Sequence, residues 1–153
     1  MTAYEKLLEK AHKKGLVVKE VEFKYVKGML KGRQIGIRKS LETSAEKADV
    51  LAEEIAHYEL TVGDILDQSV ADNRRQEHEA RRRAHDMRIG LDGIVRVWEM
   101  GCRNSYEAAE CLGTSQEFFE EALECYRRKY GTGIQHGDYT IIFEPSLMVI
   151  KDM

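Results

Sequence analysis

The stretch TSAEKADVLAEEIAHY, residues 43–58, is the segment around which the rest of the chain is organised. Small and apolar residues recur in it at helical spacing, and no glycine or proline interrupts the pattern before Gly63. Thr43 or Ser44 can accept a hydrogen bond from the first free backbone N–H groups, and Glu46 is placed for a capping box. The pattern predicts one amphipathic helix.

Three polar side chains lie close together on this predicted helix: Glu53, Glu54 and His57. Glu53 and His57 are four residues apart, so they project from one face and could grip one ion together. The spacing is that of the H-E-x-x-H zinc helix, with Glu53 in place of the first histidine. On its own, E-E-x-x-H is more often a solvated polar edge. The apolar surroundings favour a functional interpretation, because buried charges are paired or bind metals.

Composition predicts one globular domain with a small appendage. The chain has 153 residues and mixes apolar and charged residues, and its formal net charge of −3 excludes a globally basic surface. No run is long enough to span a bilayer and no signal peptide is evident, so we expect a soluble, cytoplasmic protein. Cys102, Cys111 and Cys125 lack C-x-x-C spacing, and we expect them to be buried free thiols.

The segment before residues 43–58 predicts a helix and then strands. Residues 4–14 have helical spacing and are followed by Gly15. Residues 16–26 and 34–41 are rich in β-branched and aromatic residues, and KGMLKGR between them carries two glycines. We therefore expect a small antiparallel sheet leading into the central helix. This order of elements resembles the start of many zincin-like domains.

A second polar helix is predicted over residues 70–87, after a polar connection. It carries Glu77, His78, Glu79 and His85 among its titratable residues. It also carries five arginines: Arg74, Arg75, Arg81, Arg82 and Arg83. We interpret the arginines as a solvated face or as charge partners of nearby carboxylates. A nucleic-acid patch is disfavoured, because acidic residues lie among them.

Several blocks of the chain, in order, resemble the ImmA/IrrE family of small cytoplasmic metallopeptidases, in particular its phage and mobile-element members. The matching blocks are AEEIAHY, GDILDQS, QEHEARRRA, VRVWEMGCRNSYEAAECLGTSQEFFEEAL and HGDYTIIFEPSL. The resemblance covers most of the chain. It implies an α+β fold with a zincin-like core, and an activity: cleavage of a helix-turn-helix repressor, which releases phage or element genes.

The resemblance also implies roles for particular residues. By position, Glu54 matches the general base and His57 matches the second histidine ligand. The family's third ligand is an acidic residue on the next helix, which fits Glu77, with Glu79 as the runner-up. Glu53 stands where the family has its first histidine ligand, and a carboxylate can ligate zinc at roughly 2.0–2.2 Å. A donor set with one histidine would admit Mn²⁺ as an alternative to Zn²⁺.

The implied mechanism is metal-assisted hydrolysis of a peptide bond. The ion would lower the pKa of a bound water and polarise the scissile carbonyl. Glu54 would take the proton and pass it to the leaving amine. Tyr58 and Arg74 are candidates for stabilising the oxyanion, although nothing singles them out. His78 and His85 are alternative ligands, although histidines on helices more often lie at the surface or in packing contacts.

The remainder of the chain predicts a division into three parts: a zincin-like core over residues 1–88, a helical appendage over 89–131 and a β tail over 132–153. The appendage has the rhythm of a helix-turn-helix, but its second helix begins with Gln116 and Glu117. An acidic start repels phosphate, which favours a packed helical bundle over a DNA reader. The tail is apolar and β-branched, and we expect a terminal hairpin or an edge strand.

Three functions are open at this stage. The first is a metalloendopeptidase acting on a helix-turn-helix repressor. The second is a catalytically inactive antirepressor of the same fold, which binds the repressor without cutting it, and Glu53 is the reason to keep it. The third is a DNA-binding regulator that uses residues 105–130. No membrane partner is expected, and direct nucleic-acid binding is disfavoured.

Overall fold

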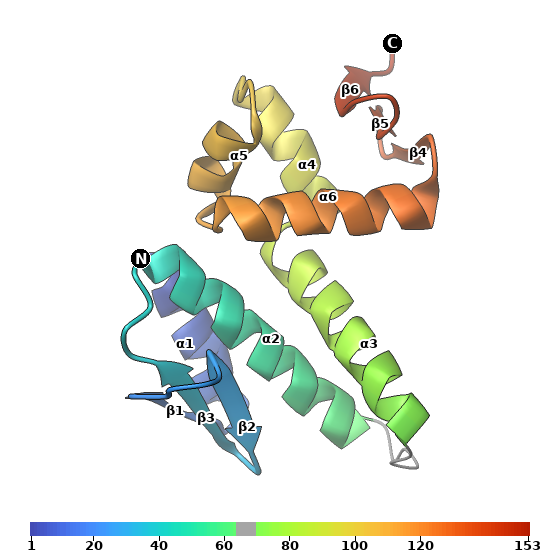
Figure 1. The fold of residues 1–153 in the computed structure, drawn as a ribbon. Helices are drawn as coiled ribbons and strands as arrows, with labels where there is room; N and C mark the ends of the chain where they lie inside the picture. The colour runs from blue at the N-terminus through green and yellow to red at the C-terminus, as the bar shows by residue number, and fades with distance from the viewer. Residues whose placement is uncertain (64–69) are drawn as a thin grey trace. The chain divides into compact units, whose positions relative to one another are not determined.

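The computed structural model describes residues 1–63 and 70–153 and divides the chain into two compact units, Met1–Met87 and Arg88–Met153 (Figure 1). The connection 64–69, expected to be polar, lies outside the described residues. The described part forms six helices and six strands, which confirms the predicted α+β class. None of these helices combines the length and apolarity needed to cross a lipid bilayer. Each unit is described by itself.

The first unit begins with helix α1 (Ala3–Lys13), which is held at its start by a complete capping box. The Thr2 hydroxyl accepts a hydrogen bond from the Glu5 backbone N–H at 3.1 Å, and the Glu5 carboxylate accepts one from the Thr2 N–H at 3.0 Å. These reciprocal bonds satisfy backbone donors that the first helical turn leaves free. Leu7 and Ala11 form the buried face of α1.

A three-stranded sheet follows, with the strands in the order β1-β3-β2. Its strands are β1 (Val17–Val21), β2 (Gly28–Lys31) and β3 (Gln34–Arg38). The central strand β3 buries Ile35 and Ile37, while β2 lies at an edge of the sheet. Gly32, with φ of +61°, makes the tight turn between β2 and β3, a backbone conformation that other residues rarely adopt.

The prediction of an antiparallel sheet in this region is wrong in one pairing. β1 pairs with β3 in parallel, from Val17↔Gln34 to Val21↔Arg38, and only β2 is antiparallel to β3. The segment KGMLKGR, expected only as the glycine-containing connection between the two predicted strands, supplies β2 itself. The hairpin therefore joins β2 to β3. The two predicted strands, β1 and β3, pair with each other along the edge of β3 that β2 does not occupy. Gly28 lies inside a strand because α2 approaches its backbone closely: a Cβ there would lie 2.5 Å from Val50 Cγ1.

The central helix α2 (Ser44–Gly63) runs beyond its predicted end. The Thr43 hydroxyl accepts a hydrogen bond from the Glu46 N–H at 3.1 Å, as the capping pattern predicts. Its buried face contacts α1, β2 and β3 and consists of Ala48, Leu51, Ala52, Ile55 and Ala56. Helix α3 (Val70–Arg88) follows, with Ala80 and Ala84 buried. The packing of α2 against the sheet fixes the backbone that carries the candidate site.

The second unit packs three helices and an antiparallel sheet around Ile94, Phe119 and Ile141. Its strands are in the order β4-β5-β6, so the expected tail hairpin is part of a three-stranded sheet. The tail belongs to the same compact unit as the helices. The elements are α4 (Gly90–Glu99), α5 (Ser105–Leu112), α6 (Gln116–Tyr130), β4 (Gly133–His136), β5 (Tyr139–Ile142) and β6 (Met148–Lys151).

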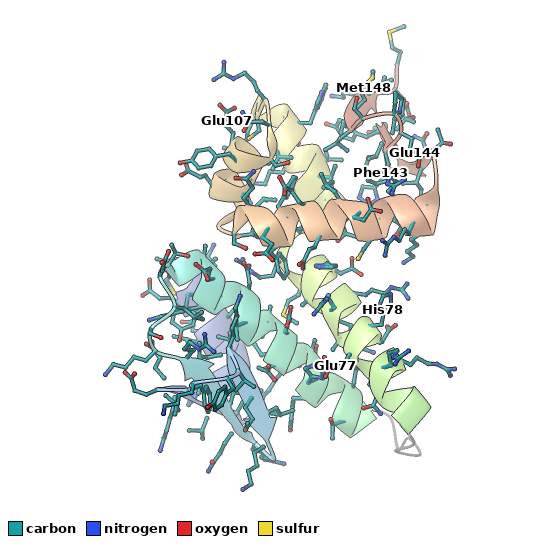
Figure 2. The ribbon with its side chains drawn as sticks, in the orientation of Figure 1. Glu77, His78, Glu107, Phe143, Glu144 and Met148 are labelled. Atoms are coloured by element: carbon teal, nitrogen blue, oxygen red, sulfur yellow. The ribbon has the colours of Figure 1, made fainter. Side chains whose placement is uncertain are left out.

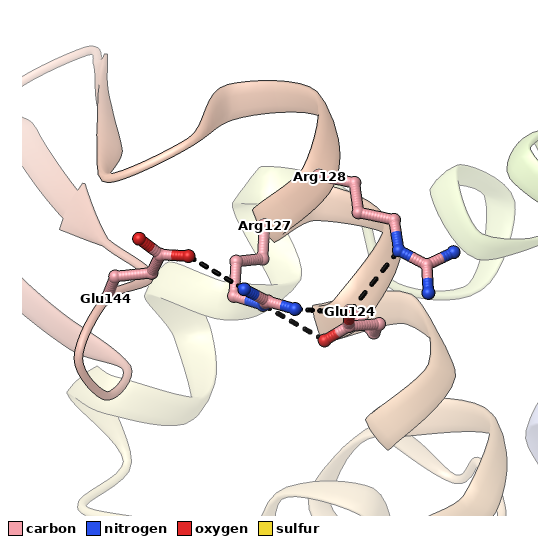
Figure 3. A network of polar contacts seen from close by, with 4 residues as sticks. All are labelled: Glu124, Arg127, Arg128 and Glu144. Atoms are coloured by element: carbon pink, nitrogen blue, oxygen red, sulfur yellow. Dashed lines mark hydrogen bonds and ion pairs between the residues drawn. The ribbon is translucent and has the colours of Figure 1, made fainter.

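An ion-pair network ties α6 to the connection between β5 and β6 (Figure 3). Arg127 Nη1 lies 2.7 Å from Glu144 Oε1, and the same guanidinium pairs with Glu124. Arg128 Nε lies 3.3 Å from Glu124 Oε1. Hydrogen bonds from Arg127 hold the pKa of Glu124 below its usual value. The network is solvent-exposed, so it orients the tail more than it stabilises the fold.

The three cysteines are free thiols, as predicted, but the prediction that they are buried is wrong. Cys102, Cys111 and Cys125 are all partly exposed. Cys102 follows the last turn of α4, whereas the other two lie on α5 and α6, towards the surface of the second unit. Apolar periodicity locates such residues on helices, but it does not show which face of a short helix the neighbouring elements cover.

Candidate functional site

The contact between α2 and α3 brings together two residues that the sequence predicts as metal ligands. His57 Nε2 on α2 lies 3.4 Å from Glu77 Oε2 on α3. The His57 side chain is 23% exposed and the Glu77 side chain 69% exposed, so the pair is open to solvent on the α3 side. Figure 2 shows Glu77 on the side of α3 that faces α2. An imidazole and a carboxylate from different helices therefore meet at one point.

Glu54 lies beside this pair, between α2 and the edge strand β2. A Cβ built on Gly28 would lie 3.1 Å from Glu54 Oε2, so the carboxyl group is next to the β2 backbone. Burial, together with the smaller effects of the nearby negative charges of Glu53 and Glu77, raises the pKa of Glu54 to about 7. A carboxyl group that titrates near neutral pH can both accept and donate a proton there.

Glu53 has a different partner from the one the sequence predicts. Its Oε1 lies 4.0 Å from Arg81 Nε, and its side chain is 32% exposed. Among the residues whose side chains the structure describes, 1–61 and 74–153, no group of three or more His, Cys, Asp or Glu side chains is arranged to hold a metal ion. The structure therefore pairs His57 with Glu77 and leaves Glu53 turned to an arginine.

Two donor atoms at the α2–α3 contact, one nitrogen and one oxygen, lie at a spacing that two ligands of one ion can have, although they do not form a three-ligand group. Two donors that share a tetrahedral ion at about 2.0–2.1 Å lie roughly 3.4 Å apart. This matches the distance of 3.4 Å between His57 Nε2 and Glu77 Oε2. A third donor is not in place, because the Glu53 carboxylate pairs with Arg81. One imidazole and two carboxylates are ligands that suit zinc and, with their oxygen bias, manganese.

The alternative ligands on α3 lie elsewhere. Glu79 Oε2 pairs with Arg82 Nη1 at 3.5 Å on the same helix. His78 is exposed, and Figure 2 shows it on the side of α3 opposite to Glu77. His85 is fully buried, and burial is the main reason that its pKa is lowered to about 4, so its imidazole is neutral. Of the candidate oxyanion partners, Tyr58 is half-buried and Arg74 is exposed.

Sequence reasoning missed Gly28, whereas Arg81 is one of the arginines predicted as a solvated face or as charge partners of carboxylates, and it pairs with Glu53. A glycine inside a run of strand-forming residues is a signal of close backbone approach, and Gly28 carried that signal. Arg81 follows Glu77 by four residues, which places both on one face of α3, so it was a foreseeable partner for a carboxylate on α2. Neither signal identifies the partner element, which only the packing of α2 provides.

Comparison of the chain with protein-family models, with curated proteins and with solved structures gives no significant match. The resemblance to the ImmA/IrrE family therefore stays a prediction from the sequence blocks.

Proposed function

We propose that the protein is a metal-dependent endopeptidase that cleaves a helix-turn-helix repressor of a phage or mobile element. The observation that carries this proposal is the contact between His57 and Glu77, which lie 3.4 Å apart with Glu54 beside them. The sequence blocks that resemble the ImmA/IrrE family supply the reaction type and the class of partner. Zn²⁺ is the proposed ion, with Mn²⁺ as the alternative.

In this proposal His57 and Glu77 hold the ion, and Glu53 completes the set after leaving Arg81. When bound, the ion polarises the scissile carbonyl and makes water a better nucleophile. Glu54 accepts the proton of the attacking water on its carboxylate and donates it to the nitrogen of the leaving amine. Its half-buried position next to Gly28 limits competing solvent around that proton.

The edge strand β2 suggests how a peptide substrate would be positioned. β2 lies at the edge of its sheet, and the Glu54 carboxyl group lies against it at Gly28. An extended peptide can add to such an edge through main-chain hydrogen bonds. A peptide bound in this way would run past Glu54, which suits an enzyme that cuts an exposed, extended segment of its partner.

One observation favours a second candidate, a catalytically inactive antirepressor. Glu53 pairs with Arg81, and the described residues hold no complete three-ligand group. A protein that binds the repressor without cutting it needs the fold and the surface but no ion. The two candidates share a partner and differ in whether a peptide bond is broken.

The test is incubation of the purified protein with the helix-turn-helix protein encoded beside it, followed by mass spectrometry of the mixture. We expect fragments with Zn²⁺ or Mn²⁺ present and none after treatment with EDTA. The Glu54→Gln variant should bind the repressor but leave it intact. Stable binding by the wild-type protein without fragments would support the antirepressor instead. Full cleavage by the Glu54→Gln variant would remove Glu54 from the mechanism.

A further inference from the structure

Three sulfur atoms gather where α4 ends and α5 passes it in the second unit. Cys111 Sγ on α5 lies 3.1 Å from Sδ of Met100, the residue that caps α4. Gly101, with φ of +76°, turns the chain between Met100 and Cys102, and the Cys102 N–H donates to the Val97 carbonyl at 3.0 Å. The turn is therefore fixed by a backbone hydrogen bond, and it presents a thioether and a thiol to α5.

The two thiols also interact with each other. Partial burial and a side-chain hydrogen bond with Cys111 raise the pKa of Cys102 above its usual value. Both thiols are partly exposed, and the Met100 side chain is 62% exposed. The three residues are therefore all at least partly open to solvent.

The charges around the cluster do not oppose a cation. Arg103 is the nearest arginine in the sequence, and its Nη2 lies 3.0 Å from Glu107 Oε2. Its backbone N–H also donates to Glu107 Oε1 at 2.9 Å. This pairing neutralises the guanidinium, and the Glu107 carboxylate, labelled in Figure 2, adds negative potential at Cys102. The electrostatic potential at Cys102 therefore favours the binding of a cation.

We propose that Met100, Cys102 and Cys111 form a binding site for a soft monovalent cation, Cu(I). Thiolate and thioether sulfur are the ligands that select Cu(I). Structural zinc sites instead use four nitrogen, sulfur or oxygen ligands in a tetrahedron, and this cluster offers three sulfurs. The site lies in a different unit from the proposed peptidase centre and does not depend on it.

Binding exchanges protons for the ion without any change of oxidation state. The S–H bonds of Cys102 and Cys111 break, two S–Cu bonds form, and the two protons go to the buffer. Met100 donates a sulfur lone pair and releases no proton. Because binding releases two protons, affinity for Cu(I) should increase as the pH rises.

The experiment is an anaerobic titration of the full chain with Cu(I), kept reduced by ascorbate, in competition with the chelator bathocuproine disulfonate. We expect one Cu(I) per chain. Removing a residue that only hydrogen-bonds to a metal ligand lowers metal affinity about 10- to 100-fold. Removing a ligand itself, in Cys102→Ser or Cys111→Ser, should therefore lower the affinity for Cu(I) at least roughly as much. Met100→Leu should weaken binding less. Cys125→Ser, which changes a thiol outside the cluster, is the matched control and should bind as the wild-type protein does.

Three results would overturn the proposal. Equal weakening of Cu(I) binding in Cys125→Ser would show that thiols anywhere on the chain bind the ion and that the cluster is not a specific site. Zn²⁺ competing with Cu(I) at comparable concentration would show that the site is not selective for a soft monovalent ion. Absence of proton release on binding, measured at constant pH, would show that the thiols are not the ligands. Circular dichroism of each variant confirms that it is folded, and the proton count on the wild-type protein is independent of any variant.

Discussion

The α2–α3 cluster of the first unit and the sulfur cluster of the second unit are built in different ways. His57 and Glu77 bring a nitrogen and an oxygen donor from two consecutive helices, with Glu54 beside them. Met100 and Cys102 flank a single glycine turn, and Cys111 lies one short helix further on. The first arrangement depends on tertiary packing, whereas the second is largely local. The donor atoms differ as well: the first cluster offers nitrogen and oxygen, the second offers sulfur, and these ligands suit different ions.

The largest expected effect separates catalysis from ion binding in the first cluster. Glu54→Gln should reduce repressor cleavage by roughly 10²–10⁴-fold, because it removes the group that transfers protons. Zinc content, measured by inductively coupled plasma mass spectrometry, should stay at the wild-type level. A variant that loses zinc together with activity would show that Glu54 is a ligand rather than a base.

The raised pKa of Glu54 makes a prediction about stability in the metal-free protein. Between pH 4.5 and about 7 the folded state keeps a proton that the unfolded state has lost, so the free energy of unfolding should fall as pH rises through this window. At about 1.4 kcal/mol per pH unit, the loss is about 3 kcal/mol at most. Denaturant unfolding at pH 5 and pH 8 should show this loss.

The Glu54→Gln variant is the control for that measurement, because its amide does not titrate. Its stability should exceed that of the wild-type protein at pH 8 and approach it at pH 5. The same pH dependence in both proteins would assign the effect to other groups. The sulfur-cluster variant Cys111→Ser should keep the wild-type pH dependence over this range, since the two clusters lie in different units.

The close approach of α2 to β2 should make Gly28 intolerant of a side chain. In Gly28→Ala the new Cβ would meet Val50 Cγ1 at 2.5 Å and Glu54 Oε2 at 3.1 Å. We expect a loss of about 1–3 kcal/mol in stability from overpacking, together with reduced cleavage because Glu54 is displaced. Thermal unfolding and the cleavage assay measure the two effects.

Gly32→Ala, in the same sheet, is the matched control. Gly32 has positive φ but open space around it, so alanine there should cost about 1–2 kcal/mol through backbone strain alone. It should leave the rate of cleavage by the folded protein unchanged. If Gly28→Ala also left that rate unchanged, the position of Glu54 against β2 would not matter for the reaction.

A smaller effect is expected when Glu53 is replaced by histidine. Glu53→His removes the partner of Arg81 and supplies the nitrogen donor of H-E-x-x-H, so zinc affinity should increase roughly tenfold or more and preference over Mn²⁺ should grow. Competition with a fluorescent zinc chelator measures the zinc affinity. Glu59→His changes a residue of the same helix that pairs with Lys14 at 3.0 Å, and it should leave zinc affinity unchanged. Equal effects of the two variants would remove Glu53 from the site.

Sequence reasoning performed well where the determinants are local. The helix α2 and its Thr43 cap follow from periodicity and capping chemistry, and the α+β class follows from the mixture of patterns. The strand order could not be predicted from the sequence, because it depends on which segments pair with β3 in the folded protein. KGMLKGR looks like a turn until Gly28 is seen to lie under α2.

The candidate site shows the same limit. The spacing of His57 on its helix is readable from the sequence, and the structure brings it to Glu77. Arg81 was among the predicted charge partners of carboxylates, but its pairing with Glu53 in particular was not predicted, because that choice depends on the geometry between two helices. The sulfur cluster was missed for a different reason: the three cysteines were expected to be buried, and methionine was not considered as a ligand.

The central claim is that His57, Glu77 and Glu53 together hold one divalent ion beside Glu54. Its most direct test is anomalous diffraction at the zinc edge from crystals grown with zinc. We expect an anomalous peak at roughly 2.0–2.2 Å from His57 Nε2 and from the Glu77 carboxylate, with Glu53 turned away from Arg81. No peak between α2 and α3, with Glu53 still paired to Arg81, would contradict it.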